Sequence, residues 1–469
     1  MTLTQILIFA GLGLLASRLY RWLDRAWLLF AASVLAAFWL QPASFVRNLP
    51  YLLPLASLGL AVLVWALTLP RRWNRQDAWA AAGLAALALL VSASRVVEPL
   101  SALSPARPPG LELAGGGLAL LAVAAVLAYR LGRGQAAWLH GGVLLLIGLL
   151  VVLKSPPLVQ AASAWLRGLG GQDPALASTL DLGWLGFSYI AFRLIHVLRD
   201  RLAGRLGEVG LRDFITYIVF FPALTAGPIE RVERFVPQLE PGFVLDSAGL
   251  LAAGQRLLSG LVMKFVLADG LAFFALNPVN AWQVSQPLWM WLLLLAYALR
   301  IFFDFAGYTS IAIGLGQLFG VTLPENFTQP YRKPNLTQFW NSWHITLAQW
   351  FRAYFFNPFT RWLRGRGAPV WLVVLLGQLS TMGLIGLWHG ITWNFLAWGL
   401  WHGLGLFAHN QWAQFAKARP LPFEPRLASG LGWLATLVFV ALGWVWFALP
   451  QPADAAHVFG VLAGVGVGR

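Results

Sequence analysis

Apolar runs long enough to cross a bilayer follow one another along most of the chain, and short Arg-bearing connections separate them. A helix needs roughly 20 predominantly apolar residues to cross ~30 Å of hydrocarbon. The runs therefore predict membrane spans at 3–19, 26–41, 49–70, 77–94, 111–129, 136–153, 183–198, 211–227, 248–276, 286–320, 369–388, 391–409 and 430–449.

These runs lack the period-two alternation of a membrane β-barrel. Only helices and closed barrels satisfy every backbone group in lipid, so the pattern predicts an all-α, polytopic transmembrane bundle. We expect the two longest segments, 248–276 and 286–320, to break into two helices each. The first run continues at full spanning length without a basic leader, so we expect it to stay as an anchor.

Composition agrees with this class, because 59% of residues are hydrophobic and only 11% are charged. The formal net charge of +15 lies mostly in the short connections, which argues against nucleic acid as a partner and reports orientation instead. Basic clusters follow the first, third, fifth and seventh spans, so we expect these exits to be cytoplasmic and the N-terminus to lie outside. The chain has no cysteine, which excludes disulfides and thiolate metal ligands.

We divide the chain into N-terminal scaffold helices (1–155), a core (156–410) and C-terminal helices (411–469). Away from their ends, the spans within residues 1–155 hold no acid or histidine apart from His140, whereas from about Gly183 the spans begin to include Arg193, His196 and Lys264. Arg300 and Asp304 are one helical turn apart, so a buried ion pair between them is the simplest way to lower their cost.

Residues 321–334 carry three prolines and several charges, which predicts a loop that is buried in protein or lines a water-filled cavity. Residues 337–352 show a helical pattern that is too polar to span, with one polar and one aromatic arc. His344 falls at the edge of the aromatic arc, where desolvation would keep it neutral. A core histidine bonded to a carbonyl is the competing interpretation.

The pentapeptide Gly-Leu-Trp-His-Gly occurs at 386–390, with His389, and again at 399–403, with His402. An ionisable residue at the end of a span is a functional-site hypothesis by default. On one continuous helix the two histidines would lie about 140° apart, so we expect at most one of them to be catalytic. The glycines at both ends of each repeat predict close helix packing.

The sequence lacks the residues that several common reaction classes require. No acidic-plus-His cluster stands at ligand spacing, so we expect no metal, and neither a Gly-x-Ser-x-Gly elbow nor a phosphate-binding Gly-rich loop is present. The inventory permits a neutral histidine that acts as general base on a hydroxyl, with an already activated acyl donor such as a thioester.

Four motifs resemble the membrane-bound O-acyltransferase family: residues 303–308 (FDFAGY), 324–327 (PENF), 339–344 (FWNSWH) and 388–390 (WHG). Within it, the chain is similar to the bacterial branch that includes the alginate O-acetylation membrane protein and the D-alanine exporter of teichoic acid modification. The resemblance covers about residues 183–410. It implies tilted or re-entrant helices around a central tunnel.

By this resemblance His389 matches the position regarded as the catalytic histidine, and His344 matches the second characteristic polar position. The motifs and their flanks supply candidate substrate-binding residues: Trp340, Asn341, Trp343, Trp388, Asp304 and Tyr308. The implied reaction moves an acyl group, with acetyl expected first, from a cytoplasmic thioester to a hydroxyl of an exported polysaccharide or cell-wall polymer. The donor would be acetyl-CoA or an acyl carrier protein thioester, with no tightly bound cofactor.

The expected location is the bacterial cytoplasmic membrane, with an extracytoplasmic acyltransferase as a candidate partner. Two alternatives stay open. The Trp340-Asn341 context is closer to D-alanyl transfer from a carrier protein, and Arg352-Ala353 departs from the Arg-Asp that relatives commonly carry. A transporter with a polar path through Arg193, His196, Arg300 and Asp304 is the minor alternative, although the halves show no internal repeat.

Overall fold

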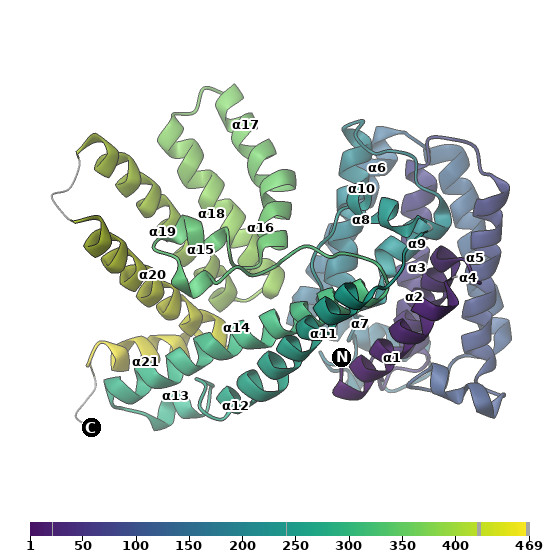
Figure 1. Cartoon of the computed structure of the whole chain (residues 1–469), viewed down its shortest axis with the longest axis horizontal. Coiled ribbons are helices and arrows are strands. Elements are labelled where there is room, and N and C mark those ends of the chain that lie inside the picture. The colour runs from purple at the N-terminus through teal and green to yellow at the C-terminus, as the bar shows by residue number, and fades with distance from the viewer. Residues whose placement is uncertain (21, 241, 420–423, 466–469) are drawn as a thin grey trace. The chain divides into compact units, whose positions relative to one another are not determined.

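The computed structural model describes residues 1–20, 22–240, 242–419 and 424–465, and it is built from helices joined by turns and loops (Figure 1). No strand occurs in these described ranges. The all-helical class predicted from the apolar runs is therefore confirmed.

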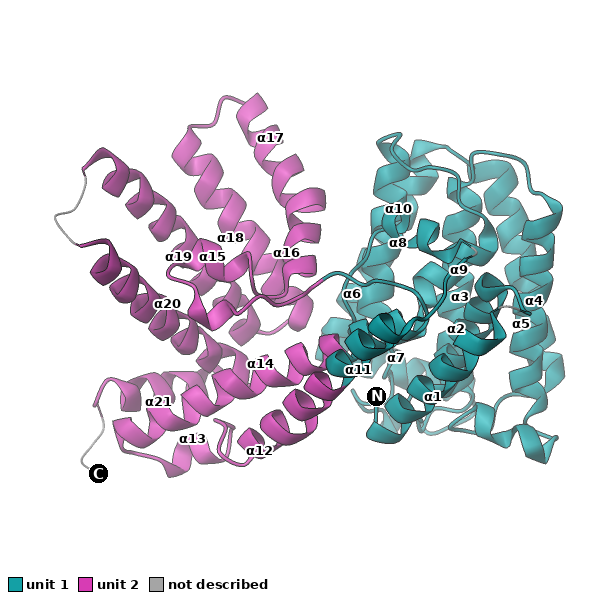
Figure 2. Ribbon diagram, in the orientation of Figure 1, with its two compact units in different colours: residues 1–257, 311–324 teal, residues 258–310, 325–469 magenta. Residues whose placement is uncertain are grey.

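The chain packs as two compact units, residues 1–257 with 311–324 and residues 258–310 with 325–469 (Figure 2). This grouping rests on packing alone, so the division at residues 155 and 410 stays a prediction. The main helices of the first unit are α1 (Leu3–Leu19), α2 (Arg25–Trp39), α3 (Leu49–Thr68), α4 (Arg75–Ala93), α5 (Leu111–Leu127), α6 (Ala136–Lys154), α7 (Pro156–Leu169), α8 (Phe187–Leu202), α9 (Leu211–Val219), α10 (Val232–Phe235) and most of α11 (Ser247–Leu261).

The second unit holds the C-terminal half of the chain. Its helices are α12 (Asp269–Ala272), α13 (Asn280–Gln283), most of α14 (Pro287–Leu318), α15 (Leu336–Trp340), α16 (Ile345–Phe351), α17 (Asn357–Gly365), α18 (Val370–His389), α19 (Trp393–Ala418), α20 (Pro425–Ala448) and α21 (Pro452–Leu462). Two short π-helical segments lie in it, η6 (Val262–Ala268) and η8 (Arg352–Phe356).

Among the described residues, eight helices are long and apolar enough to cross a membrane: Leu49–Thr68, Arg75–Ala93, Leu111–Gly132, Ala136–Lys154, Ser247–Ala272, Pro287–Leu318, Val370–His389 and Pro425–Ala448. Each of them overlaps a predicted span. The helices α1 and α2 are shorter apolar helices at the first two predicted spans. Polytopic membrane architecture follows from these helices.

Three predictions about individual segments are wrong. The two longest runs do not break, because Ser247–Ala272 and Pro287–Leu318 are continuous helices of 26 and 32 residues. The first absorbs its irregularity as the π-helical segment η6, and a π-bulge inserts residues without ending a helix. The run at 211–227 is no span, because α9 ends at Val219 and a 3₁₀ turn follows at Phe221–Ala223.

The helices α18 and α19 pack closely against each other within the second unit (Figure 1). Only residues 390–392 join them, and the Thr392 side chain caps α19 by accepting from the backbone N–H of Phe395. Such a cap satisfies one of the backbone donors that a helix start leaves free. The short connection makes the two helices antiparallel neighbours.

Candidate active site

The turn between α15 and α16 places His344 in the left-handed backbone region, with φ 43° and ψ 53°. This region is uncommon for residues other than glycine and persists only where the surroundings determine it. The surroundings here are the segment 325–335, which runs beside the turn. Ile345 donates its N–H to the Asn326 carbonyl oxygen (3.0 Å), and Thr328 donates to the Ser342 carbonyl oxygen (3.0 Å).

The side chain of Asn326, which is fully buried, fixes the tautomer of His344. Its Oδ1 accepts from the backbone N–H of Thr346 (3.1 Å) and from the Thr346 hydroxyl (3.0 Å), which identifies this atom as the oxygen. The Nδ1 of His344 lies 3.2 Å from the same oxygen and must therefore donate to it. The lone pair of the imidazole then resides on Nε2.

His344 is buried, with 3% of its surface exposed, and its Nε2 has no hydrogen-bond partner among the described residues. The ring packs edge-on against Phe305, with centroids 4.7 Å apart, and lies 6.2 Å from the ring of Trp388. His344 stands outside the spanning helices, and its burial lowers its pKa to about 3. The ring is neutral at physiological pH and presents a free acceptor, as desolvation among aromatic rings predicts.

The prediction of one helix over 337–352 is wrong. The pattern is split into α15 and α16, and the chain turns at residues 341–344. The left-handed conformation of His344 cannot continue an α-helix, and the backbone hydrogen bonds of Ile345 to Asn326 and of Thr328 to Ser342 replace the helical ones at this turn. On the aromatic side of the pattern Phe339, Trp340, Trp343, Leu347 and Phe351 are buried, and Trp350 is half-buried.

Glycines let α18 and α19 approach closely, as the repeated pentapeptide predicts. A Cβ at Gly386 would clash with the carbonyl oxygen of Phe395, and one at Gly399 would clash with that of Met382. A Cβ at Gly403 would lie 3.0 Å from the Cα of Leu379. Backbones that touch in this way fix the end of α18 against α19.

His389 is the last residue of α18 and is partly exposed. Its ring contacts Phe447 (4.8 Å between centroids), Trp398 (5.5 Å) and Phe395 (5.9 Å). The ring centroid of the neighbouring Trp388 lies 4.6 Å from that of His389 and 6.2 Å from that of His344, so one indole neighbours both imidazoles. The structure thus gathers the two predicted histidines around Trp388.

His402 does not share a helix with His389, so the angular argument, which holds for one continuous helix, does not apply here. His389 ends α18 and His402 lies within α19. His402 is fully buried, and its ring lies 5.0 Å from Trp398 and 5.1 Å from Trp340. Trp398 therefore contacts both histidines of the repeat, while only His389 is partly exposed.

The other predicted residues have different surroundings. Trp340 and Trp343 are buried, and Trp343 stacks on Phe339 with centroids 5.6 Å apart. Asn341 is exposed, and its Oδ1 accepts from Arg352 (2.7 Å). Tyr308 is buried within α14. The roles of these residues in binding substrate stay predictions.

Asp304 pairs with Lys264 and not with Arg300. The Lys264 Nζ lies 2.6 Å from the Asp304 Oδ1, and no ion pair joins residues 300 and 304 in the part of the chain described. Lys264 belongs to the π-helical segment η6, and a Cβ at Gly307 would lie 2.8 Å from its backbone nitrogen. The partner was missed because 40 residues separate it from Asp304.

The expectation of no acidic-plus-His cluster is also wrong. In the first unit, His196, Asp200 and Glu233 bring potential ligand atoms within 4.8 Å of one another. Asp200 Oδ2 lies 3.1 Å from His196 Nδ1, and Glu233 Oε2 lies 3.3 Å from His196 Nε2. The two carboxylates face different ring nitrogens, so the Asp200 pair lies within α8 and the Glu233 pair joins α8 to α10. The His-x-x-x-Asp spacing was the available signal.

The chemistry of the site follows from these positions. A neutral imidazole with a fixed tautomer can accept a proton or orient a hydroxyl, and close aromatic walls exclude water. The described residues around His344 and His389 offer aromatic rings, amides and hydroxyls. Such a site suits a donor that is already activated.

Comparisons with known proteins agree with a site of this chemistry. Residues 124–449 match the model of the membrane-bound O-acyltransferase family. The teichoic acid D-alanyltransferase of Bacillus subtilis (strain 168) is 30% identical over 275 residues, which cover 57% of this chain and 69% of that protein. A probable alginate O-acetylase of Pseudomonas aeruginosa is 35% identical over 266 residues (56% and 48%).

The peptidoglycan O-acetyltransferase of Helicobacter pylori is 32% identical over 265 residues, which cover 54% of this chain and 47% of that protein. The chain thus spans about half the length of the two acetylating relatives. The family match includes all four motifs and begins at residue 124, ahead of the motif-bearing region. The chain belongs to the membrane-bound O-acyltransferase family.

Proposed function

We propose that this protein transfers an acyl group, acetyl in the first instance, from a cytoplasmic thioester to a hydroxyl of an exported polysaccharide or cell-wall polymer. The observation that carries the proposal is the pair of histidines around Trp388, inside the region that matches the family. Relatives named as alginate and peptidoglycan O-acetylating proteins support acetyl as the group.

In the proposed reaction, His389 takes the proton of the acceptor hydroxyl as general base. The oxygen attacks the thioester carbonyl carbon, the carbon–sulfur bond breaks, and the leaving thiolate receives the proton that His389 holds. The free lone pair on the Nε2 of His344 accepts a hydrogen bond from a second hydroxyl of the acceptor and so holds the reacting hydroxyl in line with the thioester carbonyl. General-base catalysis of this kind contributes about 10²- to 10⁴-fold.

The donor is acetyl-CoA or an acyl carrier protein thioester, and it reaches the histidines through a tunnel in the bundle. The protein works in the bacterial cytoplasmic membrane, where it acylates the polymer directly or passes the group to an extracytoplasmic transferase. Because the proposed tunnel carries the acyl group through the protein, a cytoplasmic donor can serve an exported acceptor.

The second candidate is D-alanyl transfer to a cell-wall polymer. The D-alanyltransferase relative is covered over 69% of its length, and the Trp340-Asn341 context favours the same type. Membership of a family of acyltransferases argues against the transporter alternative.

Inside-out membrane vesicles test the proposal. Vesicles that contain the chain receive radiolabelled acetyl-CoA in one arm and a labelled D-alanyl carrier thioester in the other, and vesicles without the chain are the control. Chain-dependent release of free thiol with acetyl transfer supports the proposal. Transfer from the D-alanyl donor alone favours the second candidate, and no transfer from either donor overturns both.

A further inference from the structure

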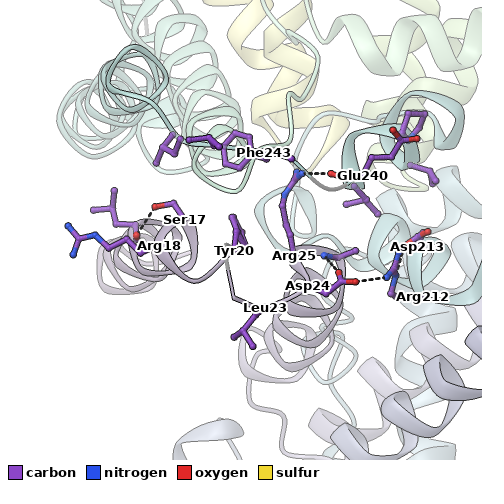
Figure 3. A pocket seen from close by; sticks show the side chains of 18 of the residues that line it. Ser17, Arg18, Tyr20, Leu23, Asp24, Arg25, Arg212, Asp213, Glu240 and Phe243 are labelled. Atoms are coloured by element: carbon purple, nitrogen blue, oxygen red, sulfur yellow. Dashed lines mark hydrogen bonds and ion pairs between the residues drawn. The ribbon is translucent and has the colours of Figure 1, made fainter.

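Two adjoining cavities lie in the first unit, away from the histidines. One has a volume of about 1100 Å³ and is lined by polar and apolar residues of α1, α2, α9 and the segment 236–250 (Figure 3). The other has a volume of about 500 Å³ and lies against α1 and α2. Tyr20 lines both cavities, which places them next to each other.

The smaller cavity is apolar. Apart from Tyr20, its wall consists of aliphatic, Ala, Phe and Trp side chains, among them Leu12, Ala16, Ala32 and Trp39. Much of the outward surface of α1 is also apolar, as the exposed Leu7, Ile8 and Leu15 show. A cavity of this composition between two apolar helices suits a hydrocarbon chain.

The larger cavity contains a buried cation, Arg25, with 6% of its surface exposed. Its guanidinium donates to the carbonyl oxygens of Phe319 (3.1 Å), Glu240 (3.2 Å) and Gly320 (2.7 Å). It also lies over the ring of Phe243, 4.9 Å from the centroid, and Figure 3 shows it between Tyr20 and Glu240.

The position of Arg25 is built into the backbone. Gly320 has φ +77°, and a Cβ there would lie 2.7 Å from the Arg25 Nη2, so this glycine makes room for the guanidinium. Three carbonyl dipoles orient the side chain but carry no net charge. Among the described residues no carboxylate forms an ion pair with Arg25, and a buried cation of this kind calls for an anion.

The other charged residues of the wall are largely matched. Arg212 lies 2.7 Å from an Asp213 oxygen and 3.5 Å from an Asp24 oxygen (Figure 3). Arg18 and Glu240, both exposed, complete the charged lining. The unmatched buried charge is therefore the guanidinium of Arg25, at the end of the cavity that Tyr20 shares with the apolar one.

We propose that these cavities bind a membrane glycerophospholipid, with its phosphate at Arg25 and one acyl chain in the apolar cavity between α1 and α2. The phosphate supplies the counter-charge that the carbonyl oxygens cannot, and the chain fills space that water would occupy at a cost. The bound lipid completes the packing of α1 against α2. This site is independent of the transferase proposal.

The test measures phospholipid retained by the full chain after extensive washing in detergent, by native mass spectrometry. Two variants address the two halves of the site, Arg25→Gln for the phosphate and Ala32→Phe for the acyl chain. The matched controls are Arg107→Gln and Ala119→Phe, at exposed positions outside both cavities. A parallel arm washes the wild-type chain with a large excess of inorganic phosphate.

We expect each cavity variant to lose bound phospholipid by about tenfold, while both controls keep the wild-type amount and free phosphate displaces little. Undiminished lipid in both cavity variants overturns the proposal. Loss in Arg25→Gln alone, with displacement by inorganic phosphate, identifies a phosphate site and also overturns it. Loss in Ala32→Phe alone overturns the assignment of the phosphate to Arg25.

Discussion

At the scale of single residues, the state of His344 is set by one amide. The Oδ1 of Asn326 accepts three hydrogen bonds, from the backbone N–H of Thr346, from the hydroxyl of Thr346 and from the Nδ1 of His344. Removing that oxygen would take away the acceptor that these buried donors share and would free the imidazole to change its tautomer. The Nε2 lone pair, on which its proposed contact with substrate depends, exists because of this arrangement.

The variant Asn326→Ala should therefore lower the free energy of unfolding by about 3 kcal/mol, because buried donors lose their partner. Denaturant unfolding in detergent micelles measures the change. The matched control is Asn341→Ala, which removes an exposed amide that bonds to Arg352 and should cost no more than about 0.5 kcal/mol. Equal stability of the two variants would contradict the assigned role of Asn326.

The buried imidazole of His344 also predicts acid sensitivity. Its pKa is about 3 in the folded chain against an ordinary 6.5, so the unfolded state takes up a proton at higher pH. The free energy of unfolding should then fall as pH drops below 6.5, by about 2 kcal/mol between pH 7 and pH 5.

Unfolding of His344→Gln at the same two pH values checks this linkage. The variant should lose less stability on acidification than the wild type, because its side chain takes up no proton. His140→Gln replaces an exposed histidine and should keep the wild-type pH dependence. If all three proteins lose stability equally between the two pH values, His344 is not the source.

At the scale of elements, the contact of α18 with α19 sets the place of His389. The backbones touch at Gly386 and Gly399, and only the three residues 390–392 connect the two helices. His389 ends its helix there, with Trp398 of α19 on one side. The glycines of the repeated pentapeptide allow α18 and α19 to pack closely. The position of His389, on which the proposed reaction depends, follows from that packing.

The variant Gly386→Ala should push the two helices apart, because its Cβ would clash with the Phe395 carbonyl oxygen. We expect a loss of about 1–3 kcal/mol in the free energy of unfolding, together with lower acyl transfer. Gly430→Ala in α20 is the matched control, since a Cβ there meets nothing within 4 Å. The free energy of unfolding of Gly430→Ala should rise by up to about 1 kcal/mol. A neutral Gly386→Ala would show that the helices do not touch there.

At the scale of the whole molecule, the distribution of Arg residues predicts the orientation in the membrane. The connection after α3 carries Arg71 and Arg72, and Arg75 begins α4, whereas the connection after α4 is proline-rich. The first should face the cytoplasm and the second the outside. In the proposed reaction, the site lies within reach of a donor on one side of the membrane and an acceptor on the other.

Cysteine labelling tests this orientation without background, because the chain has no cysteine. A membrane-impermeant maleimide should label Ser101→Cys in intact cells, and it should label Arg72→Cys only after the membrane is opened. Both positions are exposed in the structure, so access to the reagent depends on the membrane alone. The reverse labelling pattern would place the N-terminus inside.

Sequence patterns predicted the helices whose causes are local. The spans at 49–70, 77–94 and 136–153 end within a few residues of α3, α4 and α6, because hydropathy alone decides them. The helix break at His344 was not predictable in this way, since the segment that enforces it is remote from the pattern. The motifs identified both histidines. They did not predict that the Trp388 ring contacts both of them, because that contact depends on the tertiary fold.

Partners distant in sequence explain the remaining errors. Asp304 was paired with the nearest cation on its own helix, whereas Lys264 reaches it from another helix. Glu233 joins His196 across 37 positions of sequence, which no local spacing reveals. Local periodicity thus identified which residues are polar and buried, and tertiary packing decided which of them meet.

The proposed reaction depends on His389 to remove the proton from the acceptor hydroxyl. The most direct measurement compares the rate of labelled acyl transfer from thioester in vesicles that hold equal amounts of folded wild type, His389→Gln or the exposed-site control His140→Gln. We predict a rate for His389→Gln at least about 100-fold below wild type, with unchanged thermal unfolding and a normal rate for the control. A rate for His389→Gln within about threefold of wild type would contradict the account.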